Sequence, residues 1–287
     1  MIGRLTACLS PVPDAKVSRG LIWVRLPSGL VNVDPGHQLP PTNTSDWYVE
    51  HLLADAYRLA AVLETGPLDA PVDACPGWDV TRLAEHLGQI HRWANFCASN
   101  GRRPSPEEAD ALGYFDASIA ADWMRTGANE LANTLRSIDP AAPTWHPFPV
   151  AQVAGFWPRR QAHETALHRW DAERAIGRQS AIDSTLASDG IDEYFEIVIP
   201  RLIVRESCSL PTGSLHVHST DVPGEWLVSA SDGYQVIRAH QKGDAALRGP
   251  AASILLSLWG RQVDRADELS RVGDQAVLDA WLGIGGA

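Results

Sequence analysis

Residues 159–171 bring together the side chains in this sequence that are best suited to holding a metal ion. If this segment is helical, Glu164 and His168 are separated by about 40° around the axis and point the same way. Asp171 lies within about 40° of this pair, whereas His163 points about 100° away from Glu164 and is the weaker candidate. A carboxylate and an imidazole on one helix face are both ligands of the kind that zinc accepts in proteins.

A third ligand can come from a second expected helix, which begins near Asp79. His86 lies about 60° from Leu83 and about 40° from Ile90, so it borders the apolar face, and His91 falls on the other border. Together with Glu164 and His168, one such imidazole completes a set of three ligands, which leaves a coordination position open, as in catalytic zinc sites.

Each part of this set also has a simpler interpretation. A glutamate and a histidine four residues apart are most often a surface pair that contributes about 0.2–0.5 kcal/mol to a helix. A single histidine beside an apolar face is more often a hydrogen-bonded core residue than a metal ligand. The pattern alone therefore leaves metal binding as one hypothesis among these.

The elements that must position these residues are helices, because apolar residues recur at intervals of three and four. We expect helices over residues 45–66, 79–98, 114–137, 157–176 and 184–206, the last bent or broken at Pro200. Four such helices joined by loops can form a bundle, and bundle interiors are where inward-facing Glu and His ligands are usually assembled.

After Pro211 the apolar period falls to two, which predicts strands within 214–220, 225–230 and 234–240. Helices are expected over 250–259 and 274–282. The fold class is therefore α+β, with a helical bundle over 45–210 and a small α+β domain over 211–287. We expect residues 1–44 to form a disordered extension, since six prolines interrupt them and the strand-like stretch 21–26 has no obvious pairing partner.

Composition excludes several partners. The 287 residues include 24 Lys and Arg against 35 Asp and Glu, a net charge of −11, which disfavours binding to a phosphate backbone. No apolar run approaches the ~20 residues of a membrane span, and no signal peptide is evident. The four cysteines are scattered and form no CxxC motif. We therefore expect a cytoplasmic protein that binds neither nucleic acid nor membranes.

Three blocks of sequence resemble one known family. They are CPGWDVTRLAEHLGQIHRW (residues 75–93), RQAHETALHRWD (160–171) and KGDAALRGPAASILLSLWGR (242–261). The first two resemble the mycothiol-dependent maleylpyruvate isomerase family, which belongs to the DinB-like four-helix metalloproteins. The third resembles that family's small C-terminal domain, which is sterol-carrier-protein-like. The resemblance covers about residues 46–282 and keeps the order of the blocks.

The resemblance implies a metal site at the same three positions that the helical wheels select. The family's metal-binding histidine falls on His86, and its glutamate and second histidine fall on Glu164 and His168. It implies one Zn²⁺ per chain, mycothiol as the thiol cofactor and an actinobacterial source. It further implies an enzyme that isomerises a cis double bond by addition and elimination of the thiolate.

The implied substrate is a small dianion, which needs cationic partners. Arg261 and Arg248 are the candidates for this catalytic role, with Arg160 behind them, and the competing interpretation is a solvated surface arginine. Asp171 is interpreted as a partner of a ligand, or as a residue that pairs two helices, rather than as a ligand itself. Cys97 is expected in the core, and Cys75 has no base beside it in the sequence. The active site is expected near the junction of the two domains.

Two other functions stay open. The same metal site could serve a mycothiol-dependent S-transferase or detoxification enzyme, because one fold supports several chemistries. Alternatively, the chain could be a non-enzymatic protein that binds an apolar ligand in its C-terminal domain. The sequence does not indicate the oligomeric state.

Overall fold

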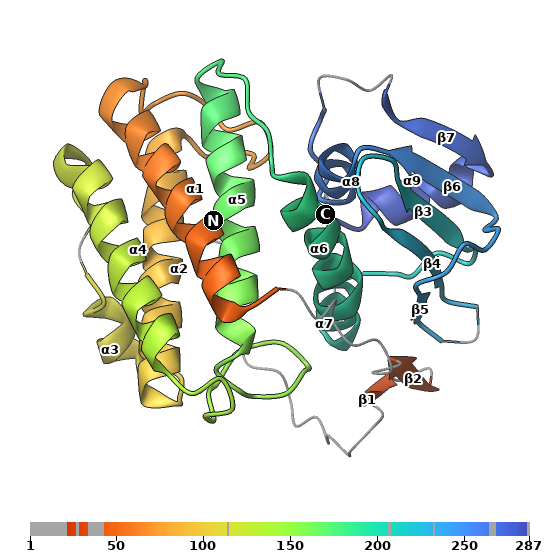
Figure 1. Ribbon diagram of the computed structural model, residues 1–287, viewed down its shortest axis with the longest axis horizontal. Coiled ribbons are helices and arrows are strands. Elements are labelled where there is room, and N and C mark those ends of the chain that lie inside the picture. The colour runs from red at the N-terminus through yellow and green to blue at the C-terminus, as the bar shows by residue number, and fades with distance from the viewer. Residues whose placement is uncertain are drawn as a thin grey trace. The chain divides into compact units, whose positions relative to one another are not determined.

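The computed structural model describes residues 43–113, 115–205, 208–231, 233–263 and 268–285, together with the backbone of two short strands. The chain divides into two compact units (Figure 1). The helical unit comprises the described residues of Pro40–His146 and Gln152–Ile182. The α/β unit comprises those of Met1–Leu39, Pro147–Ala151 and Asp183–Ala287. Each unit is described in turn.

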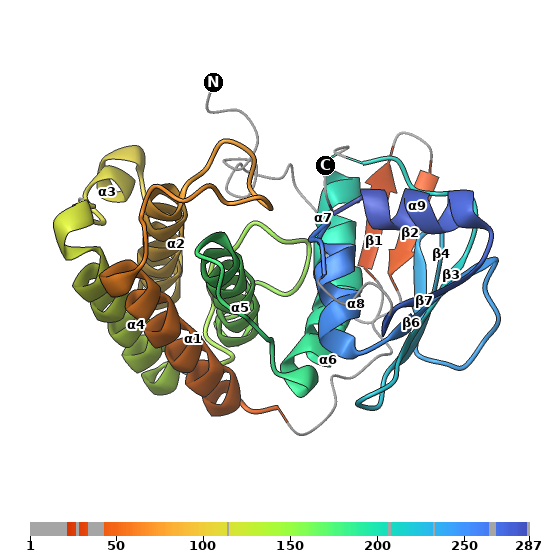
Figure 2. The same cartoon turned by 90° about the horizontal axis from the view of Figure 1, so that it is seen from above.

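Four long helices build the helical unit, and they are α1 (Ser45–Thr65), α2 (Val80–Asn100), α4 (Ala120–Ser137) and α5 (Phe156–Ala175). Both α1 and α2 pack against α4 and α5, which makes a four-helix bundle (Figure 2). A short α3 (Pro106–Asp110) and a 3₁₀ turn (Ala117–Ile119) lie in the connection between α2 and α4. The four bundle helices are those that the apolar spacing predicts.

The start of α2 is fixed by Asp79, as the sequence predicts. The Asp79 carboxylate accepts a hydrogen bond from the backbone N–H of Arg82 at 2.7 Å, and such a cap stabilises a helix by about 1 kcal/mol. The other end is closed by Gly101, whose φ of +68° lies in the left-handed region that favours glycine. These two residues define the span of the helix that carries His86.

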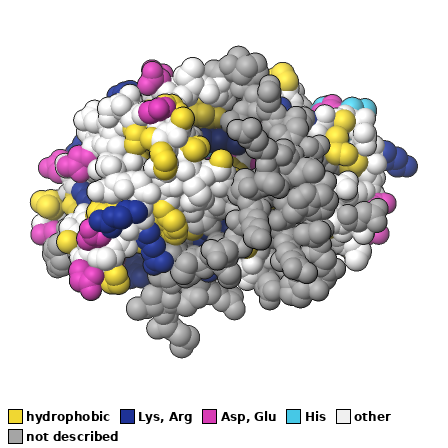
Figure 3. Space-filling view, turned by 90° about the horizontal axis from the view of Figure 1, so that it is seen from below, with side chains coloured by type: hydrophobic (Ala, Val, Ile, Leu, Met, Phe, Trp, Pro, Cys, Tyr) yellow, Lys and Arg dark blue, Asp and Glu magenta, His cyan; other side chains and the backbone are white. Residues whose placement is uncertain are grey.

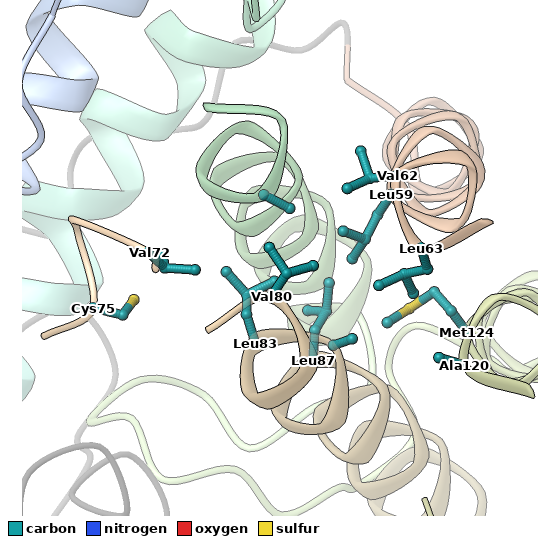
Figure 4. Close-up of a cluster of buried hydrophobic side chains, with 12 residues drawn as sticks. Leu59, Val62, Leu63, Val72, Cys75, Val80, Leu83, Leu87, Ala120 and Met124 are labelled. Atoms are coloured by element: carbon teal, nitrogen blue, oxygen red, sulfur yellow. The ribbon is translucent and has the colours of Figure 1, made fainter. Parts of the chain in front are cut away.

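A buried apolar cluster fills the space between α1, α2 and α4 (Figure 4). Its members from the helices and from the loop before α2 include Leu59, Val62, Leu63, Val72, Cys75, Val80, Leu83, Leu87, Ala120 and Met124. Burying one large aliphatic side chain contributes about 1.5–3 kcal/mol. Because Val72 and Cys75 belong to this cluster, the loop before α2 is packed onto the bundle.

Buried charges connect α5 to α1. Arg169, which is 1% exposed, donates from Nε to Asp55 and from Nη1 to Glu173, both at 2.9 Å. Glu173 also receives two hydrogen bonds from Arg58 on α1, at 3.0 and 2.9 Å. Burial raises the pKa of Asp55, and the nearby Arg169 and Arg58 act in the opposite direction. This network holds α5 against α1 on one side of the bundle.

The α/β unit contains a five-stranded sheet with strand order β5-β4-β3-β6-β7. Its strands are β3 (Leu215–Ser219), β4 (Glu225–Ser229), β5 (Gln235–Ile237), β6 (Ala245–Gly249) and β7 (Ser270–Gly273). The β3–β6 pair is parallel and the other three pairs are antiparallel. Its helices are α6 (Ser184–Glu193), α7 (Ile199–Val204), α8 (Ala251–Leu258) and α9 (Gln275–Gly283).

One face of this sheet is covered by helices, and the other carries both polar and apolar side chains, including the exposed Ile237 and Val272. Helices α8 and α9 pack against β3 and β6, and Leu215, Val217 and Leu247 on these strands are fully buried. Since side chains alternate along a strand, His216 and His218 lie on the opposite face.

The α+β fold class is confirmed, but the two units divide between Ile182 and Asp183, whereas the sequence suggested a boundary near residue 210. Helix α6 and the turns after it belong with the sheet. Asp192 accepts a hydrogen bond from Trp226 Nε1 at 2.6 Å, and the Phe195 carbonyl accepts one from Tyr234 at 2.6 Å. The change of apolar period marks a change from helix to strand and not a change of packing unit.

The long helix expected over 184–206 is interrupted before Pro200. Residues Tyr194–Val198 form a π-helical turn between α6 and α7. Proline lacks an N–H, and its ring crowds the carbonyl four residues earlier, which explains an interruption at this place.

The strand-like stretch near the N-terminus has a partner, contrary to our expectation. Strand β1 (Ile22–Leu26) pairs in antiparallel fashion with β2 (Gly29–Val33). The rest of the predicted extension, apart from residues 43 and 44, lies outside the described residues. Within the described part of the chain, no helix combines the length and apolar character needed to cross a bilayer.

Candidate metal centre

The three predicted ligands converge inside the helical unit. His86 projects from α2, and Glu164 and His168 project from α5, which packs against it. Glu164 Oε1 lies 3.5 Å from His86 Nε2 and 3.4 Å from His168 Nε2. The three candidate ligand atoms all lie within 4.8 Å of one another.

These separations match what one tetrahedral ion requires. Zinc with bonds of about 2.1 Å holds its ligand atoms about 3.4 Å apart and places two imidazole ring centres about 5.2 Å apart. The ring centres of His86 and His168 are 5.3 Å apart, with their planes at 84°. The donor set of two imidazoles and one carboxylate, with a position left open, is also a known type of catalytic zinc site.

Asp171 orients His168. Its Oδ2 lies 3.2 Å from His168 Nδ1, and its side chain is fully buried. An ionised carboxylate only accepts hydrogen bonds, so His168 Nδ1 carries the donated proton and Nε2 faces Glu164. A histidine bound to metal typically has such a partner.

Arg160 holds the other side of Glu164. It is buried, and its Nη2 donates to Glu164 Oε2 at 2.5 Å. Oε2 is therefore engaged by the guanidinium while Oε1 faces the two imidazoles. Arg160, placed behind the other arginines in the sequence analysis, is a direct neighbour of the predicted ligand.

The charges at the centre reinforce one another. Burial opposes ionisation of Glu164, but Arg160, His168 and His86 outweigh it and hold the pKa of this carboxyl well below its usual range. Burial likewise opposes a charge on His168, but Asp171 and Glu164 raise the pKa of this imidazole to about 9. Any cation bound here must replace the proton on His168, so its binding releases a proton.

The site is partly open to solvent. The side chains of His86 and Glu164 are 17% and 21% exposed. The Trp78 ring lies edge-on to His86, with ring centres 5.0 Å apart, so it forms one wall of the site.

His91, on the other border of the apolar face, is a core residue. It is fully buried, and its Nε2 lies 2.9 Å from Thr165 Oγ1, which joins α2 to α5. Burial, with a further contribution from Arg92, lowers the pKa of His91 to about 3. The hydrogen-bonded core interpretation therefore holds for this histidine.

Cys75 is the neighbour that sequence reasoning missed. Its sulfur and the donor atoms of His168 and Asp171 lie within 4.8 Å of one another. No base is adjacent to Cys75 in the sequence, and the proximity arises because the loop before α2 packs onto the bundle. Cys97, by contrast, is in the core as expected, and burial raises the pKa of its thiol to about 12.

The other two predicted arginines belong to the α/β unit. Arg248 is an exposed residue of β6, on the sheet face opposite Leu247. Arg261 follows α8, and its Nη1 donates to the Trp259 carbonyl at 3.0 Å. Their catalytic role stays a prediction.

Comparison with known proteins agrees with this architecture. The mycothiol maleylpyruvate isomerase N-terminal domain matches residues 49–173, and the C-terminal domain of the same family matches residues 185–280. The crystal structure of the mycothiol-dependent maleylpyruvate isomerase aligns with a TM-score of 0.53 and 11% identity, covering 80% of this chain and 93% of that chain. A histidine-to-alanine mutant of that enzyme aligns with a TM-score of 0.50 and 10% identity over the same shares. At this identity the likeness shows a common fold.

No curated protein sequence matches this chain. Both family domains are nevertheless present in order, and they account for most of the described residues. The chain therefore belongs to the mycothiol-dependent maleylpyruvate isomerase family.

Proposed function

We propose that this protein is a zinc-dependent enzyme that uses mycothiol to isomerise maleylpyruvate or a similar small dianion, by addition and elimination of the thiol. The observation that carries the proposal is the position of Glu164 Oε1, 3.5 and 3.4 Å from the Nε2 atoms of His86 and His168. Family membership supports the thiol and the class of substrate.

Zinc, when bound, would supply a positive charge that keeps a coordinated thiol deprotonated and nucleophilic at neutral pH. The residues of this chain prepare the site for it. Asp171 keeps His168 Nε2 directed at the centre, and Arg160 fixes Glu164 so that Oε1 is presented. Ligands that are already oriented lose little conformational freedom on binding.

A dianionic substrate must be bound by cations, and we assign this role to Arg248 and Arg261. Both lie in the part of the chain that matches the family's C-terminal domain. Arginine suits the role because its guanidinium can bind a carboxylate with two hydrogen bonds. Arg160 is less suited, because it is already paired with Glu164.

The first test is the zinc content and activity of a Glu164→Gln variant, with Glu50→Gln on the exposed side of α1 as the matched control. We expect Glu164→Gln to lose one zinc per chain and the mycothiol-dependent isomerisation while its circular dichroism stays that of the wild type. The control should keep both. If Glu164→Gln retained its zinc and its activity, the proposal would be wrong.

The fate of the thiol separates isomerisation from S-transfer. An isomerase regenerates mycothiol in every cycle, so trace amounts support complete conversion. A transferase consumes one thiol for each product formed. Measuring free thiol against product in the same reaction therefore identifies the class of reaction.

A further inference from the structure

A second group of histidines lies on the α/β unit, on the sheet face away from α8 and α9. His216 and His218 alternate with the buried Leu215 and Val217 along β3. Glu225 on β4 is the direct register partner of His218, and His240 follows β5. Histidine side chains are visible beside acidic ones at the right of Figure 3.

The Glu225 carboxylate lies among the three imidazoles. Its Oε2 is 2.7 Å from His240 Nδ1 and 3.6 Å from His216 Nε2, and its Oε1 is 3.4 Å from His218 Nδ1. The four candidate ligand atoms lie within 4.8 Å of one another.

The rings are spaced almost as one ion would require. The ring centres of the three histidines are 5.4, 6.0 and 6.1 Å apart, against about 5.2 Å for two imidazoles on a tetrahedral zinc. Side-chain rotations that move each ring by a few tenths of an ångström to about half an ångström would close the difference. His218 and His240 are at least partly exposed, so they have room to make such a movement.

One atom of the group lacks a partner. His216 Nε2 is buried and has no hydrogen-bond partner, and the His216 side chain is 12% exposed. A buried polar nitrogen without a partner is destabilising and calls for an explanation. This nitrogen faces Glu225, so an ion at the centre of the group would satisfy it.

We propose that His216, His218, Glu225 and His240 form a second metal site, which binds Zn²⁺ with four protein ligands. Imidazole-rich sites select zinc and similar transition metals, whereas calcium and magnesium prefer oxygen ligands. Four protein ligands fill the tetrahedron, which is the structural type of zinc site rather than the catalytic type. This site shares no residue with the centre in the helical unit, although Arg248, to which we assign substrate binding, is the register partner of His218 on β6.

The site would fasten an irregular segment to the sheet. His240 lies in the connection between β5 and β6, three residues after the end of β5. Figure 1 shows this connection beside the sheet. The other three ligands lie on β3 and β4, so a bound ion would anchor residues 238–243 to the two strands. Lys242, an exposed residue of this connection, provides a tryptic cleavage site that reports on the anchoring.

The test is the zinc stoichiometry of the metal-stripped full-length chain after dialysis against buffered free Zn²⁺. We expect two zinc ions in the wild type and in a His51→Gln control on α1. One is expected in the double variant His218→Gln/His240→Gln, one in Glu164→Gln, and none in the three substitutions together. An unchanged double variant would overturn the second site, whereas an unchanged Glu164→Gln would instead overturn the catalytic site.

Proteolysis provides a second measurement that does not depend on stoichiometry. Zn²⁺ should slow trypsin cleavage after Lys242 at least tenfold in the Glu164→Gln background. It should have no effect once His218→Gln and His240→Gln are added. Equal cleavage rates with and without Zn²⁺ in the Glu164→Gln background would also overturn the proposal.

Discussion

Asp171 Oδ2 lies 3.2 Å from Nδ1 of His168, less than one helical turn away on α5. This contact fixes which nitrogen of His168 faces Glu164. Because the contact is buried, losing the carboxylate is costly: water has little access to take its place.

Replacing Asp171 with Asn tests this relationship without removing a ligand. The amide is nearly isosteric but uncharged, so it stabilises the required form of His168 less well. We expect zinc affinity to fall about 10–100-fold, as measured by competition with a chromophoric chelator. Asp79→Asn, at the cap of α2, should leave zinc affinity unchanged. An unchanged affinity in Asp171→Asn would show that Asp171 has no role in orienting the ligand.

The buried charges between α1 and α5 predict a large loss of stability in Arg169→Met. This change leaves Asp55 and Glu173 without their buried partner, and such losses cost about 3–5 kcal/mol. Urea unfolding provides the measurement. Arg82→Met is the control, because Arg82 is exposed and its Nη1 lies 3.9 Å from Glu85 Oε2. An exposed ion pair of this kind contributes at most about 1 kcal/mol. Similar losses of stability in the two variants would show that the buried charge network does not stabilise the bundle.

His91 predicts a pH dependence of stability. Its pKa is about 3 in the folded chain, against about 6.5 for an unfolded histidine. Between these values the unfolded chain binds more protons, so this histidine makes the free energy of unfolding fall as pH falls below 6.5, by up to about 1.4 kcal/mol per pH unit. His91→Gln should remove this slope in unfolding experiments from pH 6.5 to 4. The same slope in both proteins would rule His91 out as its source.

Gly88 predicts a packing effect on α2. A Cβ atom at this position would overlap the ring of Trp123 on α4, so Gly88→Ala should destabilise the chain by about 1–3 kcal/mol. Gly283→Ala is the control, because no atom lies near the position of its Cβ and alanine favours helix. Thermal unfolding of both variants is the measurement. If Gly88→Ala were as stable as Gly283→Ala, close packing of α2 on α4 would be contradicted.

The helices and the shared face of Glu164 and His168 were accessible from the sequence because both depend on local spacing, whereas His86 was selected with the help of the family resemblance. The apolar period predicted helix over 157–176, and α5 spans Phe156–Ala175. Once that helix is given, the shared face of Glu164 and His168 follows from geometry alone. Nearly all residues of α5 are buried, so this helix is not amphipathic, and the pattern alone could not show which of its sides faces the bundle.

The features that were missed depend on contacts between distant parts of the chain. Strands β6 and β7 contain few β-branched or aromatic residues, so neither shows the composition that marks a strand in a sequence. Cys75 reaches His168 through the packing of a loop, and no spacing rule describes that. The histidine group around Glu225 likewise requires the β3–β4 register, which becomes known only when the sheet is assembled.

The network of Arg169, Asp55, Glu173 and Arg58 has a consequence for Glu164 and His168, the two candidate ligands on α5. These contacts hold α5 against α1, so they restrict both rotation of α5 about its axis and sliding along it. The positions of Glu164 and His168 along the α5 axis, and the directions of their side chains, are therefore set before any ion binds. Substitutions at Asp55 or Arg58 on α1 would therefore change the affinity for the ion by letting α5 rotate, although neither residue contacts Glu164 or His168 in this network.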